Sequence, residues 1–211
     1  MHCYTFTSSV ISDSIAGEGY EGSIHQGVTI KNGKAYFSND SYVSLPPGVT
    51  GSYKVITIEM WADLPSILGT AESAPLFLLG NSSSFLFCTH SQLEGKINCS
   101  FCISPSICST MTSIDSYSSI SIHLVATFDW ISGSMTLFLN SLWQCSTSLR
   151  FLLPDSLSPS FKFLIGGPVT PSHTRPFLGS VDEFRVWAGP LPPSTITSHF
   201  ENGPQDMGNL L

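Results

Sequence analysis

Two adjacent carboxylates, Asp182 and Glu183, stand in a mostly apolar stretch near the end of the chain, residues 181–187. Paired carboxylates can serve as a general acid and base or bind a divalent cation. Adjacent side chains of a strand point to opposite faces, so these two cannot act together in catalysis. At most one of them therefore holds a metal ion. The alternative is a structural carboxylate that is hydrogen-bonded or paired with Lys34 or Arg185.

Cysteines supply the second chemical signal, because Cys99 and Cys102 make a Cys-x-x-Cys. This spacing occurs in zinc and redox sites, but the sequence has no second cysteine or histidine pair at metal spacing, and no βαβ pattern surrounds it. A disulfide framework is therefore favoured over zinc, and buried thiols are the other alternative.

A predicted hairpin suggests how the cysteines pair. Residues 85–88 and 96–101 have the composition of strands around a turn, which places Cys88 opposite Cys99 or close to it. Cys102 with Cys108 would close a small loop, and Cys3 and Cys145 are the two cysteines that remain. This is one of the fifteen connectivities that six cysteines allow. The predicted disulfides are Cys88–Cys99, Cys102–Cys108 and Cys3–Cys145.

Aromatic rings and Asn-x-Ser triplets suggest contacts with carbohydrate. Trp130 lies in a predicted hairpin tip, where an exposed indole could stack on a sugar ring, and Trp143 and Tyr42 are further candidates. The alternative for Trp130 is that its ring folds back onto the edge of the domain. The predicted N-glycosylation sites are Asn39, Asn81 and Asn98.

The elements that must position these residues are strands. Residues 54–62 alternate in character, which predicts a half-buried antiparallel strand with Glu59 on its outer face. Residues 104–119 are rich in serine and are expected to form a long loop, and residues 194–200 a short helix. The expected strands are 35–37, 42–45, 54–62, 75–79, 84–88, 96–101, 120–128, 134–139, 142–145, 161–165 and 181–187.

Short strands separated by regular turn signals predict an all-β, two-sheet antiparallel jelly-roll sandwich with a short C-terminal helical turn. We expect residues 1–211 to form a single domain with its core between about residues 25 and 203. The predicted core residues are Ile56, Ile58, Met60, Leu124, Ala126, Phe128, Leu137, Leu139, Phe163, Ile165, Phe184 and Val186.

Composition excludes several classes of function. Charged residues make up 11% of the chain and the net charge is −7, so no basic stripe is available for nucleic acid. Apolar runs fall short of the ~20 residues that span a bilayer, which argues against membrane insertion. The N-terminus lacks the features of a signal peptide. With the cysteines and glycosylation triplets, this favours a domain excised from a longer secreted or cell-surface protein.

Five segments in order resemble laminin G-like and pentraxin-like jelly-roll domains of the concanavalin A-like lectin/glucanase superfamily. They are residues 33–46, 56–62, 123–140, 161–167 and 179–187. The resemblance implies that the N- and C-terminal strands lie side by side. It also implies a structural calcium ion held by the acidic residue of the closing strand, here Asp182, with Asn39 and Asp40 as further ligands.

The expected function is a non-catalytic extracellular recognition or adhesion module for glycan or protein ligands. A structural domain that packs against neighbouring domains or subunits of an assembly is the alternative. An enzyme that acts on glycosides is disfavoured, because the Glu-x-Asp-x-Glu pattern of the superfamily's glucanases does not occur in the sequence.

Overall fold

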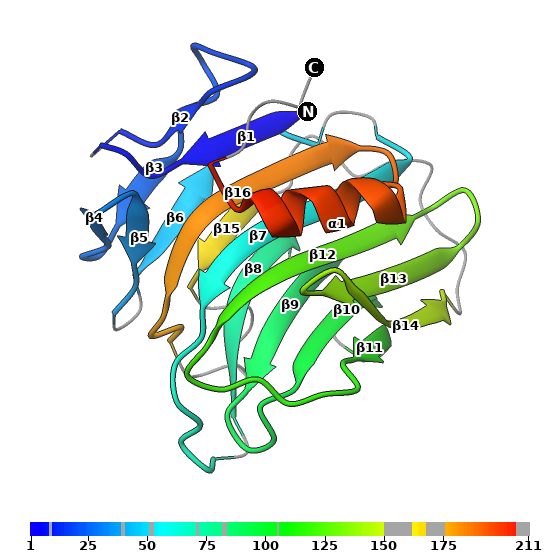
Figure 1. The fold of residues 1–211 in the computed structure, drawn as a ribbon. Coiled ribbons are helices and arrows are strands. Elements are labelled where there is room, and N and C mark those ends of the chain that lie inside the picture. The colour runs from blue at the N-terminus through cyan, green and yellow to red at the C-terminus, as the bar shows by residue number, and fades with distance from the viewer. Residues whose placement is uncertain are drawn as a thin grey trace.

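Two antiparallel sheets packed face to face make up the computed structural model of the chain (Figure 1). The structure describes residues 1–8, 10–38, 41–50, 53–70, 72–81, 84–104, 106–149, 162–167 and 176–205. The elements are β1 (His2–Thr5), β2 (Ser12–Asp13), β3 (Ser23–His25), β4 (Thr29–Lys31), β5 (Lys34–Tyr36), β6 (Tyr42–Leu45), β7 (Val55–Asp63), β8 (Ser73–Gly80), β9 (Phe85–Ser91), β10 (Ile97–Ser104), β11 (Ile107–Thr112), β12 (Ser121–Asp129), β13 (Ser134–Leu139), β14 (Leu142–Ser148), β15 (Lys162–Gly166), β16 (Ser180–Ala188) and α1 (Pro193–Asn202).

Within the described residues, one sheet has nine strands in the main order β14-β13-β12-β7-β16-β1-β2, and β5 pairs with β16 and carries β4. The other sheet has seven, in the order β11-β10-β9-β8-β15-β6-β3. The closing strand β16 lies between β7 and the first strand, β1. The expected jelly-roll sandwich and the adjacency of the terminal strands are therefore confirmed.

Alternate side chains of the two inner faces build the hydrophobic core. All twelve residues that the strand alternation assigned to the core are buried, at 1% exposure or less. Aromatic rings from both sheets meet there: Phe184 of β16 contacts Phe77 of β8 and Phe163 of β15, both edge to face. Such contacts add to the burial of large apolar surfaces, which is the main stabilising term of a sandwich.

Helix α1 lies across the outer face of the nine-stranded sheet (Figure 1). Pro193 occupies the first turn of the helix, a position where a missing N–H costs little, and Ile196 and His199 are its buried residues. Because the helix covers the sheet, β7 is buried on both faces, and the expected half-buried strand with an exposed Glu59 is wrong. The described residues contain no helix that is both long enough and apolar enough to cross a bilayer.

Two further expectations about the elements are wrong. The serine-rich segment expected to be a loop contains β11, which pairs with β10 from Asn98↔Thr112 to Ser104↔Ile107. Ser109 and Met111 are its buried side chains, so the apolar alternation is too weak to see in the sequence. The short strands β1 to β4 also escaped detection, because strands of two to four residues carry little periodic signal.

Disulfides join neighbouring strands of the seven-stranded sheet. Cys88–Cys99 links β9 to β10, as expected from the hairpin geometry, and Cys102–Cys108 links β10 to β11, as expected for a pair that closes a small loop. The predicted Cys3–Cys145 pair is wrong. Cys3 on β1 and Cys145 on β14 are five strands apart in the same sheet, about 24 Å at the usual strand spacing, whereas a disulfide needs Cα atoms within ~7 Å.

Candidate functional site: a cavity beside the C-terminal helix

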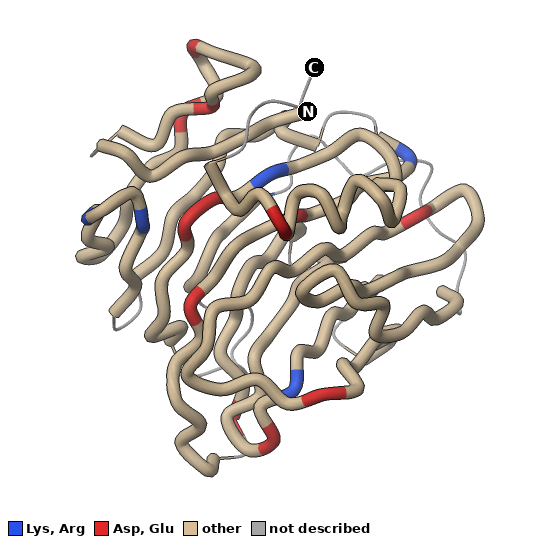
Figure 2. The backbone as a smooth tube through the Cα atoms, in the orientation of Figure 1, with Lys and Arg blue, Asp and Glu red and all other residues tan. Residues whose placement is uncertain are grey.

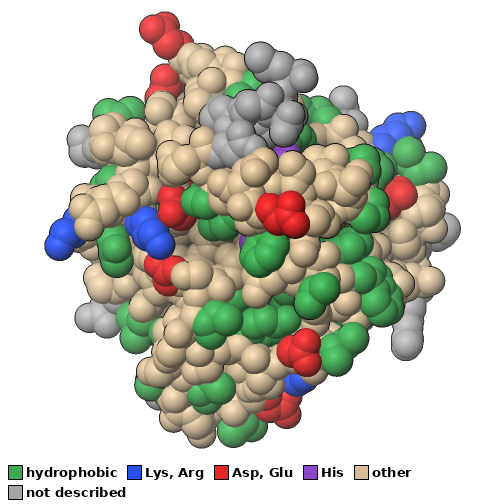
Figure 3. Space-filling model, in the orientation of Figure 1, with side chains coloured by type: hydrophobic (Ala, Val, Ile, Leu, Met, Phe, Trp, Pro, Cys, Tyr) green, Lys and Arg blue, Asp and Glu red, His purple; other side chains and the backbone are tan. Residues whose placement is uncertain are grey.

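A cavity of about 270 Å³ opens on the outer face of the nine-stranded sheet, next to α1. Figure 3 shows this face, with charged side chains on one side of the hollow and hydrophobic side chains on the other. Charges are sparse over the rest of the chain, as Figure 2 shows. The cavity is lined by Lys34, Trp61, Ala62, Asp63, Ser121, Ile122, His123, Asn140, Asp182, Phe200, Gly203 and Pro204.

Strand register brings these residues together from distant parts of the sequence. His123 of β12 lies opposite Trp61 of β7, and Ser121 lies opposite Asp63 two positions along. Outward-facing side chains alternate with core residues on each strand, so both pairs face α1. Asn140, in the turn after β13, makes two hydrogen bonds with the backbone of His123. The amide of His123 donates to Asn140 Oδ1, and the amide of Asn140 donates to the carbonyl of His123.

The polar wall of the cavity is an ion cluster. Lys34 Nζ donates to Asp63 Oδ2 at 2.8 Å and lies 3.8 Å from Asp182 Oδ2. Ser121 and Ser180 also donate to Asp63, at 2.5 and 2.6 Å. Burial opposes ionisation of Asp63, but these hydrogen bonds outweigh it and keep the pKa of Asp63 below its usual value. Burial raises the pKa of Asp182, with Lys34 acting against the shift.

Asp182 was the residue expected to bind calcium. In the structure its carboxylate has an ammonium group beside it and accepts a hydrogen bond from Gln205 at 3.1 Å. Lys34 therefore supplies the positive charge that a cation would provide, which matches the salt-bridge alternative. No group of three or more ligating side chains suited to a metal ion occurs in the described residues. The other two expected ligands, Asn39 and Asp40, lie outside them.

The described surroundings of Asp182 are those of an ion pair. Calcium binding by Asp182 with Asn39 and Asp40 stays a prediction. Thermal melting with calcium and with a chelator tests it, and an unchanged midpoint would contradict it.

The floor of the site rests on a buried carboxylate, Glu59, which is fully inaccessible to solvent. Its Oε1 accepts hydrogen bonds from His123 Nε2 at 2.8 Å and from His199 Nδ1 at 2.9 Å. Its Oε2 accepts from Trp187 Nε1 at 2.9 Å and lies 3.5 Å from Arg185. Burial alone would raise the pKa of Glu59, but the two histidine hydrogen bonds and Arg185 lower it to about 2. Glu59 is therefore ionised.

Arg185 continues this buried network away from the cavity. Its Nε donates to Glu183 Oε1 at 2.5 Å, and its guanidinium carbon lies 4.5 Å from the centre of the Trp61 ring. A terminal nitrogen donates to the carbonyl of Pro204 at 2.9 Å, which ties the segment after α1 to the sheet. Burial raises the pKa of Glu183 despite Arg185. Glu183 thus has the salt-bridged role considered for this acidic pair, with no access to a substrate.

Two buried polar atoms of the cavity-lining side chains have no hydrogen-bond partner among the described residues: Trp61 Nε1 and His123 Nδ1. The two rings stack with centroids 4.4 Å apart, and Phe200 of α1 lies nearly parallel to the imidazole at 6.0 Å. An unpaired buried donor or acceptor costs about 1–3 kcal/mol. A bound group that satisfied both atoms would recover this free energy.

Trp130, the first candidate for a sugar platform, is 8% exposed and packs edge to face on Phe101 in the core. Its predicted role as an exposed platform is therefore wrong, and the folded-back alternative is correct. The hairpin tip lies over the sandwich edge, where the large indole finds apolar contacts from both sheets.

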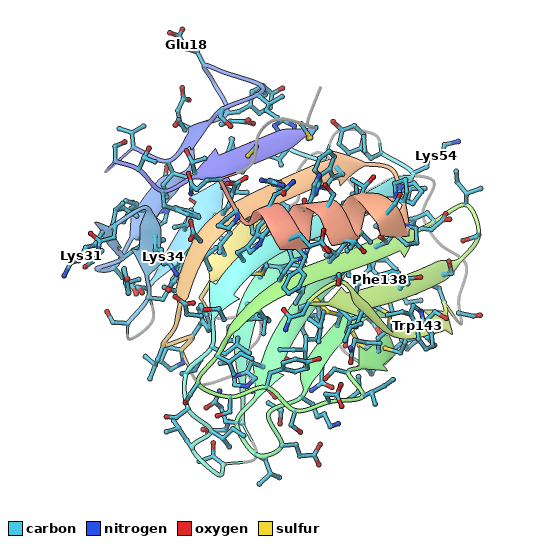
Figure 4. The ribbon with its side chains drawn as sticks, in the orientation of Figure 1. Glu18, Lys31, Lys34, Lys54, Phe138 and Trp143 are labelled. Carbon is cyan, nitrogen blue, oxygen red and sulfur yellow. A yellow bond between two sulfur atoms is a disulfide. The ribbon has the colours of Figure 1, made fainter. Side chains whose placement is uncertain are left out.

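Tyr42 and Trp143 lie away from the helix-side cavity. Tyr42 stacks on His25 at 4.4 Å and lines a second cavity of about 470 Å³ on the seven-stranded sheet. Trp143 is 55% exposed on β14, opposite Phe138 of β13, and Figure 4 shows these two labelled side chains close together. The structure therefore places the three aromatic candidates in three different regions.

The predicted glycosylation sites differ in their surroundings. Asn81 is exposed in the β8–β9 turn, where its Oδ1 accepts a hydrogen bond from the Ser84 amide. Asn98 is half-buried on β10, and its Oδ1 accepts from Thr112 of β11. Asn39 lies outside the described residues. Glycan attachment at these asparagines stays a prediction.

Most residues of the cavity were missed by the sequence analysis. Asp63 and Trp61 carry a weak signal, because they continue the outward-facing positions of β7 beyond Glu59. His123 carries no clear signal, and only one of its two ring nitrogens has a partner among the described residues. Phe200 carries no signal, since the docking of α1 on this face cannot be deduced from helical periodicity.

A sandwich of two antiparallel sheets whose first and last strands are neighbours defines the class of jelly-roll β-sandwich proteins. The chain belongs to a laminin G-like family, because a family model described as the concanavalin A-like lectin/glucanases superfamily matches residues 37–197. No curated protein sequence matches the chain.

Several solved structures share the fold. A botulinum neurotoxin type C structure, described as dependent on two ganglioside molecules for entering cells, has a TM-score of 0.78 at 11% identity and aligns with 96% of this chain and 50% of its own. The binding domain of botulinum neurotoxin DC in complex with rat synaptotagmin II has a TM-score of 0.76 at 12% identity, with coverages of 96% and 51%. The binding domain of botulinum neurotoxin serotype G has a TM-score of 0.72 at 14% identity, and the alignment covers 95% of this chain and 50% of that domain. The chain therefore spans about half the length of each of these structures.

Proposed function

We propose that this domain is a non-catalytic recognition module that binds a carbohydrate in the cavity beside α1. The observation that carries the proposal is the make-up of the cavity, in which Lys34, Asp63 and Asp182 face the aromatic rings of His123 and Phe200. Charged and amide groups bind sugar hydroxyls, and aromatic rings cover the apolar face of a pyranose. At about 270 Å³, the cavity is at the small end of ligand pockets, which suits one sugar ring.

The comparisons support a binding role without naming a ligand for this chain. The superfamily to which the chain belongs includes lectins. Among the proteins with the same fold, one is described with ganglioside molecules and another with synaptotagmin, so both a glycan and a protein are ligands of related folds.

Carboxylate placement supports a non-catalytic role. Glu59 and Glu183 are fully buried and hydrogen-bonded, so neither reaches a substrate. Asp63 and Asp182 do line the cavity, but both are engaged by Lys34, which donates to Asp63 and lies 3.8 Å from Asp182. Incubation with bound oligosaccharides should release no new reducing ends, and catalytic release that Asp182→Asn abolishes would contradict this part of the proposal.

A glycan array followed by calorimetry tests the binding itself. Any glycan that binds should lose about tenfold or more in affinity with Asp182→Asn, because a charge-assisted hydrogen bond is lost. Tyr42→Ala is the matched control, since Tyr42 lines the other cavity. A blank array, or binding that Tyr42→Ala but not Asp182→Asn removes, would reject the cavity beside α1 as the site.

We also propose that the domain lies in an extracellular setting, as part of a secreted or cell-surface protein. Two disulfides within one sheet support this, because such bonds persist in oxidising compartments and are rare in the cytosol. Non-reducing mass spectrometry of the protein from its native source tests the setting. Six thiols in that material would reject it.

A protein ligand or a packing role in an assembly is the second candidate function. Leu142, Trp143 and Ile114 are 63%, 55% and 61% exposed, and the side chain of Gln144 links the backbones of Ile114 and Leu142. Such an apolar edge is typical of protein contacts. Sedimentation of the protein across concentrations, with Trp143→Ala as the comparison, would detect self-association through this edge.

A further inference from the structure

We propose that Trp61 Nε1 and His123 Nδ1 act as a donor–acceptor pair for one hydroxyl group of a neutral sugar, and that Glu59 fixes the tautomer of His123 that makes this possible. The inference rests on the proposed carbohydrate site and deepens it, because it names the ligand chemistry that the floor of the cavity selects.

Glu59 decides which nitrogen of His123 carries hydrogen. An ionised carboxylate only accepts hydrogen bonds, so the nitrogen that contacts it at 2.8 Å, Nε2, must donate. In the neutral ring, Nδ1 is then left as an acceptor. The same carboxylate oxygen accepts from His199, and Arg185 and Trp187 hold the other oxygen, so Glu59 cannot rotate without losing several bonds.

Trp61 supplies the complementary group. Its indole nitrogen can only donate, and it has no acceptor among the described residues. Because Trp61 and His123 are register partners with stacked rings, the donor and the acceptor belong to adjacent strands of one sheet face. The Arg185 guanidinium over the same indole and the His123 ring against it hold Trp61 in place.

A hydroxyl is the simple ligand group that can satisfy both atoms, since it donates one hydrogen and accepts through its oxygen. A carboxylate would leave His123 Nδ1 unpaired and would meet Asp63 and Asp182. An ammonium group would leave Trp61 Nε1 unpaired and would meet Lys34. The pair therefore selects neutral hydroxyl ligands against both classes of ion.

Phe200 controls access to the pair. Both unpaired atoms are shielded from solvent, and the Phe200 ring lies over the imidazole while being 40% exposed itself. Phe200 is the exposed one of the three rings, so it is the ring that would turn outward to admit a hydroxyl. Once displaced, the ring can still cover the apolar face of a sugar.

Methyl glycosides of glucose, galactose, mannose and N-acetylglucosamine are suitable probes, with sialic acid and glucosamine as the anionic and cationic comparisons. We expect at least one neutral probe to bind and both ions to bind more weakly. Trp61→Phe keeps the ring but removes the donor, and it should weaken that probe about tenfold. Trp143→Phe, the matched change at an exposed tryptophan, should leave its affinity unchanged.

Deoxy analogues of the bound probe keep the test sharp if Trp61→Phe harms folding. The analogue that lacks the bonded hydroxyl should lose at least as much affinity as the variant, because it loses the bond to His123 as well, and the two losses should not add. Nitrogen-15 NMR of the full chain should show hydrogen on Nε2 of His123, and binding should shift the Nδ1 resonance and the indole signal of Trp61.

Equal binding of a neutral probe to wild type and Trp61→Phe, when Asp182→Asn abolishes it, would overturn this inference and leave the carbohydrate site standing. So would a doubly protonated His123 in the complex, or failure of every neutral monosaccharide probe beside a positive glycan array. A blank array would overturn the proposed function as well.

Discussion

At the scale of single residues, the structure concentrates its polar chemistry under α1. Glu59 accepts hydrogen bonds from His123, His199 and Trp187 and lies beside Arg185, all away from solvent. A buried charge is tolerated only when its partners are complete, so each member of this cluster depends on the others. This cluster supports the floor of the cavity.

Glu59→Gln should therefore destabilise the protein by about 3 kcal/mol, because the amide cannot accept from every neighbour and leaves Arg185 with less compensation. Urea unfolding measures the loss. Glu94→Gln, at an exposed position, is the matched control and should change stability by less than about 0.5 kcal/mol. Equal stability of the two variants would contradict the role given to Glu59.

Low pH should remove the contribution of Glu59 to the free energy of unfolding. Its folded pKa of about 2 lies below the ordinary value of 4.5, so its contribution is present above about pH 4.5 and is lost as the pH falls toward 2. Glu183 acts with the opposite sign, because burial raises its pKa. The stability difference between wild type and Glu59→Gln should shrink as the pH falls from 5 to about 2.5, measured by urea unfolding at each pH. A constant difference would contradict the pKa assignment.

The sequence predicted the roles of some single residues and not of others, for physical reasons. The acidic pair was correctly limited to separate roles, since strand alternation alone forbids joint action of Asp182 and Glu183. The fate of Trp130 could not be predicted, because an indole in a turn can face solvent or fold onto the core with the same local sequence. Pairing of Asp182 with Lys34 depends on the contact of β5 with β16, which joins residues far apart in the chain.

At the scale of elements, α1 converts an outer sheet face into a second buried layer. Ile196 is 1% exposed, His199 binds Glu59, and Pro204 accepts from Arg185 after the helix ends. The same helix supplies Phe200 to the cavity. The helix was predictable from its prolines and its position after the closing strand, but its docking site was not, because contacts between α1 and β7 leave no local pattern.

Ile196→Ala should reduce stability by about 2–4 kcal/mol, because it opens a void between α1 and the sheet. It should also weaken ligand binding in the adjacent cavity, although Ile196 does not line it, because the change loosens the helix that carries Phe200. Thermal and urea unfolding measure the first effect, and calorimetry measures the second. Ser194→Ala, on the exposed first turn, serves as the control. An unchanged midpoint for Ile196→Ala would show that α1 is not docked as described.

At the scale of the whole molecule, the jelly roll was predictable because the alternation of residue types along β7, β12 and β16 shows which face packs into the core between the sheets. The longest strands showed this alternation most clearly. Pairing of the cysteines was predictable for neighbours in a hairpin and not for Cys3 and Cys145, whose separation depends on the order of strands across the entire sheet.

Thiol counting checks the covalent structure of the whole chain. At pH 8, folded protein should show no rapid alkylation at Cys3, whose thiol is buried and has a pKa raised by burial to about 12. After unfolding without reductant, mass spectrometry should find two labels, at Cys3 and Cys145, and six after reduction. No labels before reduction would restore the discarded third disulfide, and six would remove both assigned bonds.

The position of β16 between β1 and β7 has a consequence for synthesis of the chain on the ribosome. About 175 residues separate the end of β1 from the start of β16, so at ~5–20 residues per second the first strand waits roughly 10–35 s for its partner. During that interval the edge of β7 is open to wrong pairing with other nascent chains. Folding of this domain is therefore expected to finish only after release of the closing strand, and to benefit from chaperones that hold the open edge.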